Sequence, residues 1–390
     1  MTRRSVHEYA ASVRQRYRKG KKAEKGRILE EFCAATGLHR KAAIRLLNQD
    51  ERPKAVRRGR PRRYGQVVME PLRLVWEMSD RMCGKLLVSV MPALVAALER
   101  HGELQMESDV RRLLLSMSAA TIDRLLKRQA IHMSNVQPAK KRPAPAGLKS
   151  QVPIRTWSEW KDVKPGSLQA DLVLHCGESL DGFYLATLTS VDVASGWIEL
   201  QPIWGLGKQR VGTGMHLIRQ RLPFNLESLH SDNGGEFIND LLIPWCRREG
   251  ISFSRGRPYR KNDQAWVEQR NWQSVRRHVG YERFSSQAAY DLLLKLYPLL
   301  SLQANFFRPV RKLVSKERQG AKLVKHYDEP QTPYQRLQAS GLLHEGDRPR
   351  IEKLLLALNP AELQRQIDRV LHQLWEQADR RGERKLASVG

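Results

Sequence analysis

Cysteine is scarce in this chain of 390 residues: only four are present, and no two of them form a Cys-x-x-Cys pair. The sequence therefore indicates neither a zinc ribbon nor a disulfide framework, and reduced thiols are expected. Long apolar runs are lacking as well. No stretch reaches the ~20 residues of a membrane-spanning helix, and the basic N-terminus lacks the apolar core of a signal peptide. We expect a cytoplasmic protein without a membrane partner.

Acidic residues are outnumbered by basic ones. The chain holds 68 Lys and Arg against 41 Asp and Glu, which gives a net charge of +27 and a pI near 10.3. The excess is uneven, because residues 1–150 hold 33 of the basic and 14 of the acidic side chains. Such a surplus points to a polyanionic partner. With 41% hydrophobic residues the chain can also bury real cores, and its length suits several domains.

Three of the acidic residues stand in surroundings that suit metal-dependent phosphoryl chemistry. Asp171 lies in an apolar run, Leu168–Leu174, that predicts a buried strand. Asp232 ends a short strand and opens a glycine-rich turn, and 35 residues separate it from Glu268 at the start of a predicted helix. Hard divalent cations take oxygen ligands, and two of them ~3.5–4 Å apart can promote an in-line phosphoryl displacement. Each acid alone is explained as well by a solvated surface group, but the three together favour a site.

The order and spacing of these acids, with Ser-Asp-Asn-Gly-Gly-Glu-Phe at Ser231–Phe237, resemble the catalytic core shared by retroviral integrases and bacterial DDE transposases. The resemblance covers about residues 165–285. It implies an RNase H-like fold in which Asp171, Asp232 and Glu268 form the catalytic triad and bind two Mg²⁺ or Mn²⁺ ions. It also implies transposon-end and target DNA as partners, a homo-oligomer assembled on DNA, and association with the bacterial nucleoid. Retroviral integrases carry a His/Cys zinc module ahead of the core, and this sequence shows none.

The pattern between residues 151 and 284 predicts the α/β fold that the resemblance implies. A first strand, a hairpin partner at Phe183–Asp192 and a third strand at Trp197–Ile203 precede alternating helices and strands. We therefore expect a mixed five-stranded sheet covered by helices. Of the remaining acids, Asp192 is a candidate neighbour of the site, whereas Glu236 is expected to face solvent or DNA.

Residues 1–50 predict an all-α helix-turn-helix DNA-binding domain. Gly37 separates two segments of helical periodicity, and the second carries basic residues that suit a major groove: Arg40, Lys41 and Arg45. A basic helical hairpin without a DNA role fits the same pattern.

Residues 51–65 follow as a basic linker whose Gly-Arg-Pro centre resembles an AT-hook. Narrow A·T minor grooves concentrate negative potential and attract arginine, and the candidates here are Arg58, Arg60, Arg62 and Arg63. A flexible linker that touches only phosphates is the alternative.

Residues 66–135 predict a second helical DNA-binding domain. A serine with N-cap character precedes its last helix, in which an apolar stripe is flanked by Arg124 and Arg128. A proline-rich linker at residues 136–150 then leads to the catalytic core at residues 151–284.

Residues 285–390 predict a small basic and helical C-terminal module that contacts DNA or another subunit, with a solvated basic surface as the alternative. Near the triad, three further side chains are candidate DNA contacts: Arg260, Lys261 and Asn271. Asn271 lies three residues after Glu268 and shares its helix face, so orienting Glu268 is a second role for it.

These motifs predict a DNA transposase that binds transposon ends, hydrolyses a phosphodiester with bound metal and joins the 3′-OH to target DNA. Two alternatives remain open from the sequence. One is a DNA-binding regulator or architectural protein with a relic RNase H-like core, which the intact triad disfavours. The other is a nuclease that cuts RNA–DNA hybrids, which the large basic N-terminal modules disfavour.

Overall fold

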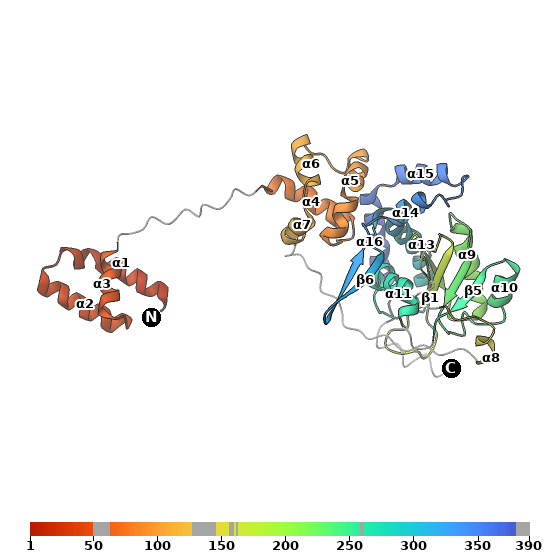
Figure 1. The fold of residues 1–390 in the computed structure, drawn as a ribbon, viewed down its shortest axis with the longest axis horizontal. Coiled ribbons are helices and arrows are strands. Elements are labelled where there is room, and N and C mark those ends of the chain that lie inside the picture. Colours follow the sequence, from red (N-terminus) through yellow and green to blue (C-terminus); the bar gives the residue numbers. More distant parts are fainter. Residues whose placement is uncertain (50–62, 127–145, 156–159, 161–162, 258–260, 380–390) are drawn as a thin grey trace. The chain divides into compact units, whose positions relative to one another are not determined.

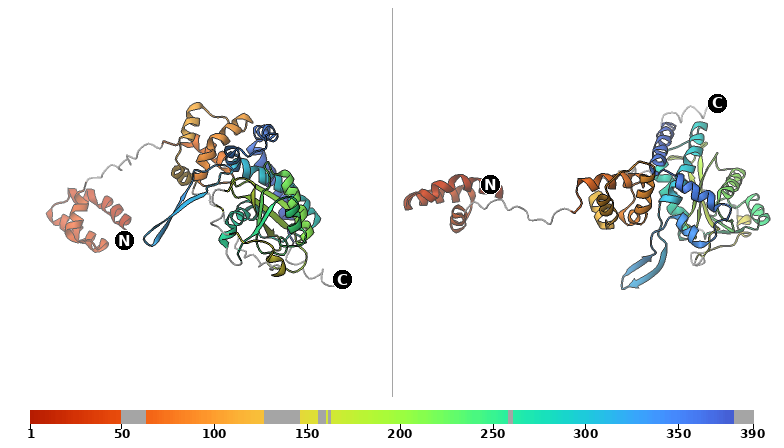
Figure 2. Two further views of the ribbon diagram at one scale, coloured as in Figure 1. Left: turned by 45° about the vertical axis from the view of Figure 1, so that its right-hand side comes forward. Right: turned by 90° about the horizontal axis from the view of Figure 1, so that it is seen from above.

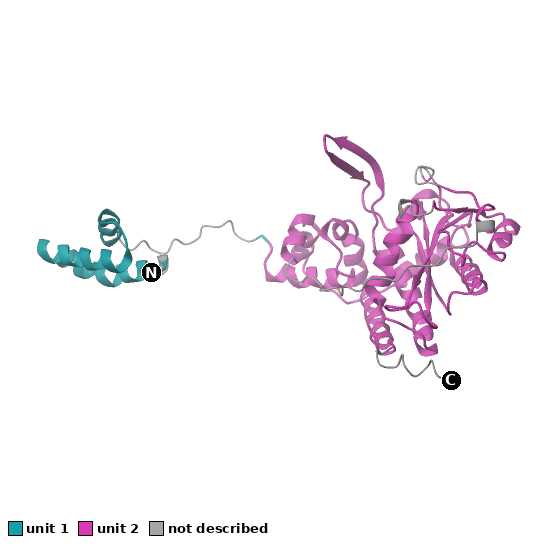
Figure 3. Cartoon of the chain, turned by 90° about the horizontal axis from the view of Figure 1, so that it is seen from below, with its two compact units in different colours: residues 1–63 teal, residues 64–390 magenta. Residues whose placement is uncertain are grey.

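The computed structural model describes residues 1–49, 63–126, 146–155, 160, 163–257 and 261–379. The chain divides into two compact units, residues 1–63 and 64–390 (Figure 3). We refer to them as unit 1 and unit 2. None of the described helices is both long and apolar enough to cross a membrane.

Unit 1 is a bundle of three helices: α1 Arg3–Lys19, α2 Lys22–Thr36 and α3 Arg40–Asn48. Its core is built around Phe32, which stacks on Tyr9 with ring centroids 5.2 Å apart. Gly37 ends α2 in the left-handed conformation, at φ 71°, which favours glycine. The side chain of His39 then caps the start of α3. The helical character predicted for this region is thus confirmed.

Unit 2 begins with four helices: α4 Gln66–Met78, α5 Gly84–Arg100, α6 Ser108–Leu115 and α7 Ala119–Leu126. The backbone N–H of Gly84 donates to the Asp123 carboxylate of α7 at 2.6 Å. A Cβ at Gly84 would collide with the carbonyl oxygen of Ala119, so glycine allows α5 and α7 to touch. The four helices share one hydrophobic core with the sheet that follows. Most of the linker expected at residues 136–150 lies outside the described residues, and Ala146–Lys149 forms α8.

A buried charge cluster attaches the turn between α4 and α5 to the rest of unit 2. Asp80 and Arg81 have φ values of 55° and 51°, which are uncommon for residues with a Cβ. The Asp80 carboxylate pairs with Arg277 at 3.2 Å and also with Arg308. His278 lies 3.7 Å from the same carboxylate. Breaking a buried pair leaves an uncompensated charge, so the cluster holds this turn in place.

The centre of unit 2 is a mixed five-stranded sheet in the order β3-β2-β1-β4-β5. β1, β2 and β3 are antiparallel neighbours, whereas β4 and β5 run parallel to β1. The strands are β1 Ser167–Leu174, β2 Ala186–Asp192, β3 Ile198–Ile203, β4 Ser228–Ser231 and β5 Ser252–Arg255. Every residue of β1 to β4 is buried. This arrangement confirms the expected sheet and fits an RNase H-like core.

Helices cover both faces of the sheet (Figure 1). α9, Lys208–Arg221, packs on the face that carries Leu188, where a Cβ on Gly214 would stand only 2.6 Å from Ile203 Cδ1. α10, Leu242–Arg248, connects β4 to β5. The other face, which we call the Asp171 face, lies under α13, Gln287–Leu302, and one continuous helical segment. That segment consists of η3 Lys261–Gln264, α11 Ala265–Arg270, the π-helical η4 Asn271–Arg276 and α12 Arg277–Val279.

The C-terminal residues pack onto this body, except for one hairpin. β6 Leu313–Gln319 and β7 Lys322–Tyr327 form a separate two-stranded sheet that projects from unit 2 (Figures 1 and 2). Gln303 donates to Gln364 of α16 at 2.7 Å, which joins α16 to the end of α13. The remaining elements are η5 Gln303–Phe307, α14 Pro333–Ser340, α15 Arg348–Ala357 and α16 Pro360–Glu376.

Candidate active site

The two aspartates of the predicted triad lie on adjacent strands. β1 and β4 are parallel with Ala170 opposite Ser231, so Asp171 and Asp232 occupy the next pair of positions in the same register. Neighbouring strands are about 4.8 Å apart. Asp171 is buried, with 9% of its surface exposed, and Asp232 is half-buried just beyond the end of β4. The sheet therefore brings together two carboxylates that are far apart in the sequence.

Both carboxylates are oriented by hydrogen bonds. Oδ1 of Asp171 accepts from the backbone N–H of Leu172 at 2.8 Å. Oδ2 of Asp171 accepts from the side-chain amide of Asn271 at 2.7 Å. Oδ1 of Asp232 accepts from the N–H of Gly234 at 2.9 Å, which closes the glycine-rich turn. The sequence left the partner of Asn271 open between DNA and Glu268; in the structure its amide contacts Asp171.

Gln169 fixes the helix that carries Glu268 onto the Asp171 face. Gln169 precedes Asp171 by two residues and so points to the same side of β1. Its Nε2 donates to the carbonyl of Asp263 at 3.0 Å, and its Oε1 accepts from the N–H of Val267 at 3.4 Å. Glu268 follows Val267 directly, so the turn of α11 that carries it is held to the Asp171 face through Gln169.

The third acid of the predicted triad, Glu268, is exposed on α11. Among the described residues, no group of three Asp, Glu, His or Cys side chains is arranged to hold a metal ion. The register thus sets Asp171 and Asp232 at neighbouring positions of the sheet, and the helix that bears Glu268 is held to the same face through Gln169.

Two buried oxygen atoms next to Asp171 bear on whether an ion fits there. Thr189 lies directly opposite Asp171 on β2. Its Oγ1 and the Oδ1 of Asn271 are buried without a hydrogen-bond partner in the described part of the chain. Buried polar atoms are seldom left unpaired, and an ion is one explanation when they are. Carboxylate, amide and hydroxyl oxygens are the donors that a hard divalent cation takes, so this set fits Mg²⁺ or Mn²⁺.

Asp192 is excluded as a member of the site. It pairs with Leu168, three residues from Asp171, and therefore belongs to the opposite face. Its buried carboxylate accepts from the N–H of Gly166 at 2.9 Å and from both the N–H and the hydroxyl of Ser195 at 2.6 Å. Burial raises the pKa of Asp192, and the Ser195 hydrogen bonds oppose that rise. Its role is to hold the turn after β2.

Glu236 lies closer to the site than the sequence indicated. The point where a Cβ would stand on Gly234 is 2.5 Å from Glu236 Oε2 and 2.9 Å from Asp232 Oδ1. Both carboxylates therefore lie close to the same point beside Gly234, and Glu236 is half-buried. A larger residue at this position would displace one or both of them.

Comparison with known proteins gives a family but no established activity. No protein-family model matches the chain. It is 40% identical over 329 residues to the uncharacterized protein y4rM of Sinorhizobium fredii (strain NBRC 101917 / NGR234), covering 84% of this chain and 94% of that protein. This chain belongs to the y4rM family. Among solved structures it is similar to the catalytic core domain of BIV integrase, at 23% identity and a TM-score of 0.30 over 45% of this chain and 95% of that domain.

In this y4rM family member, some of the basic residues predicted to contact DNA are exposed, and others lie outside the described residues. Arg40, Lys41 and Arg45 are exposed on α3, and Arg124 is exposed on α7. Arg63 is exposed at the end of unit 1. The positions outside the described residues are Arg58, Arg60, Arg62, Arg128 and Arg260, and the side chain of Lys261 is likewise not described.

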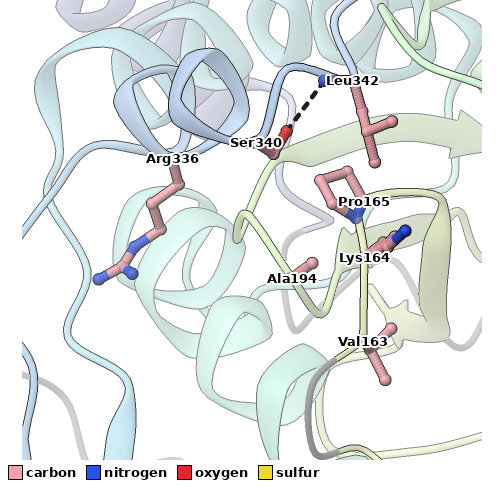
Figure 4. A pocket seen from close by; sticks show the side chains of 7 residues that line it. All are labelled: Val163, Lys164, Pro165, Ala194, Arg336, Ser340 and Leu342. Carbon is pink, nitrogen blue, oxygen red and sulfur yellow. Dashed lines mark hydrogen bonds between the residues drawn. The ribbon is translucent and has the colours of Figure 1, made fainter.

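A surface pocket of unit 2 lies apart from the acids. It has a volume of about 330 Å³, and Figure 4 shows its lining residues: Val163, Lys164, Pro165, Ala194, Arg336, Ser340 and Leu342. The guanidinium of Arg336 pairs with Asp328 at 2.7 Å. None of Asp171, Asp232 and Glu268 lines this pocket.

Proposed function

We propose that this y4rM family member is a DNA transposase. It binds the ends of a mobile element, hydrolyses a phosphodiester there, and joins the resulting 3′-OH to target DNA by a second in-line displacement. The observation that carries the proposal is the β1–β4 register, which sets Asp171 and Asp232, just after β4, at neighbouring positions under the helix that bears Glu268.

The residues of the site have separable tasks. Asp171 and Asp232 would hold divalent cations from the sheet, and Glu268 on α11 would complete the ligand set. The cations would activate the attacking oxygen and stabilise the leaving oxygen. Asn271 keeps Asp171 in one orientation through its 2.7 Å hydrogen bond. Gly234 leaves space for Asp232 to turn toward Asp171.

DNA recognition falls to the helical parts of the chain. In unit 1 a three-residue turn separates α2 from α3, and α3 exposes Arg40, Lys41 and Arg45. In unit 2 a turn of the same length separates α6 from α7, and α7 exposes Arg124. Such turns between short helices suit helix-turn-helix motifs, whose second helix enters a major groove. Two ends must be joined together, so the active form is an oligomer on DNA.

Strand-transfer assays with Asp232→Asn and Glu268→Gln test the proposal. Each variant is expected to lower Mg²⁺- or Mn²⁺-dependent strand transfer by about 10³-fold, since a metal ligand contributes several kcal/mol and each ~1.4 kcal/mol is tenfold. Binding of the element's end stays within about twofold. Asp240→Asn is the matched control, because Asp240 forms an exposed pair with Lys208 and such pairs contribute little.

The exposed position of Glu268 favours one competing function, a DNA-binding regulator with a relic core. That protein would bind the same ends but show no metal-dependent cutting. End binding by the wild-type chain without strand transfer in either metal would select the regulator and reject the transposase.

A further inference from the structure

The β6–β7 hairpin has almost no contact with the body of unit 2. Its two strands are joined at Gly320, with φ 63°, and in the described part of the chain they pair only with each other. Val314 is 69% exposed and Leu323 is 52% exposed. Isolated two-stranded hairpins are marginally stable in water, so a projecting hairpin needs either support at its base or a partner along its length.

The base of the hairpin is firmly supported. The backbones of Val310 and Gln331 exchange hydrogen bonds of 2.8 and 3.2 Å. Above them, the N–H of Lys312 donates to the Asp328 carboxylate at 2.6 Å, and Asp328 pairs with Arg336 of α14 at 2.7 Å. The ammonium of Lys312 also donates to the carbonyl of Ala194, in the turn after β2. The hairpin is therefore held in one direction by the sheet and by α14.

The strand register divides the hairpin side chains between two faces. Lys316 lies opposite Lys325, and Arg318 lies opposite Leu323. These four positions share one face, because opposite residues and residues two apart point the same way. We call it the basic face; it carries three cations and no acid. The other face pairs Ser315 with His326, Glu317 with Val324 and Gln319 with Lys322, and Glu317 contacts His326 at 3.4 Å.

The basic face gathers charges of one sign. Lys316 faces Lys325, and Arg318 lies two residues away on the same face. Lysines that serve only to keep an exposed hairpin soluble would not need to gather on one side. A polyanion lying along this face would be attracted by all three cations.

We propose that the β6–β7 hairpin is a DNA-binding arm whose basic face lies against duplex DNA. The inference rests on the proposed function, because it assigns part of that protein's grip on DNA. A seven-residue strand spans about 23 Å, and the major groove admits a two-stranded ribbon. A second copy of this chain is disfavoured as the occupant, since its own basic face would repel this one and the net charge of the chain is +27.

The salt dependence of DNA binding tests the arm. Affinities of the full-length chain for a labelled DNA duplex are measured by fluorescence anisotropy at several salt concentrations. Each neutralised phosphate contributes about 0.9 to the slope of log affinity against log salt. The triple variant Lys316→Gln, Arg318→Gln, Lys325→Gln is expected to lower that slope by about 2–3.

Matched single variants isolate the face. Lys325→Gln and Lys322→Gln each remove one exposed charge from β7, but only Lys325 lies on the basic face. We expect Lys325→Gln to lower the slope by about 1 and Lys322→Gln to leave it unchanged. Thermal unfolding of all variants should match the wild type, because none of these side chains is buried.

The proposed DNA-binding role of the hairpin would be rejected by an unchanged slope in the triple variant or by equal losses from both single variants. It would also be rejected by no salt-dependent duplex binding of the wild type, or by a loss confined to an RNA duplex of the same length. A change of oligomeric state in light scattering, with the DNA slope intact, would make the basic face a protein interface and likewise reject the arm. The Asp232→Asn assay tests the proposed function separately. A lowered slope in the triple variant, combined with strand transfer that Asp232→Asn leaves unaffected, would keep the arm and reject the transposase.

Discussion

The side-chain amide of Asn271 donates a 2.7 Å hydrogen bond to Oδ2 of Asp171, joining the π-helical turn after α11 to the central strand of the sheet. The other amide atom, Oδ1, is buried without a hydrogen-bond partner in the described part of the chain. One side chain thus orients a carboxylate and offers an oxygen beside it.

Asn271→Ala tests this positioning role. The loss of a group that orients a metal ligand typically costs 10–100-fold in activity or metal affinity. We expect strand transfer to fall by about that factor at low Mg²⁺ and to recover in part as Mg²⁺ is raised. Titration of strand-transfer rate against Mg²⁺ measures it. Gln269→Ala, two residues away and exposed, should leave the titration unchanged; equal effects of both variants would remove the special role of Asn271.

The buried His278 predicts loss of stability in acid. Burial is the main cause that lowers its pKa to about 4; Asp80 opposes this change, and Arg308 and Arg277 contribute to it. The unfolded imidazole titrates near ~6.5. Between these two values the unfolded chain binds a proton that the folded chain does not, so the free energy of unfolding falls as the pH drops from about 6.5 to about 4. At neutral pH the imidazole is uncharged, and its contact with Asp80 is not an ion pair.

His278→Gln should make that decline shallower, by up to about 3 kcal/mol across the window. Urea unfolding at pH steps between about 6.5 and 4 measures it. Part of the decline remains in the variant, because burial also lowers the pKa of His175 well below its usual range. His372→Gln, at an exposed histidine, is the control. Parallel pH profiles for wild type and His278→Gln would refute the prediction.

Gly84→Ala should destabilise unit 2. The added methyl meets the backbone carbonyl of Ala119, which cannot move without shifting α7, and overpacking of this kind costs about 1–3 kcal/mol. Gly212→Ala in α9 is the matched control, since nothing lies within 4 Å of its Cβ position. It should stabilise the helix by about 0.5–1 kcal/mol. Urea midpoints compare the two, and similar shifts of one sign would contradict the packing argument.

The sheet and the two aspartates were accessible from the sequence because local patterns specify them. Asp171 is a single acid in an apolar strand, and Asp232 stands where a strand meets a glycine turn. The strand at Phe183–Asp192 was predicted slightly long, since pairing of β2 begins at Ala186. Such elements follow from alternation and turn residues alone.

The contacts of the site depend on tertiary register, which a local pattern does not contain. Gln169 and Thr189 read as ordinary strand residues until the helix over β1 and the pairing with β2 are known. A polar residue two positions before a buried aspartate was the available signal for Gln169. Asn271 begins a π-helical turn, which changes the phase of the residues that follow from that of a regular α-helix.

The Asp80 cluster links the turn between α4 and α5 to the helical segment that bears Glu268. Arg277 and His278 belong to α12, which continues without interruption from the helix of Glu268. Loss of the Asp80 carboxylate would therefore leave buried cations uncompensated at both the turn and that segment, and would loosen the two together.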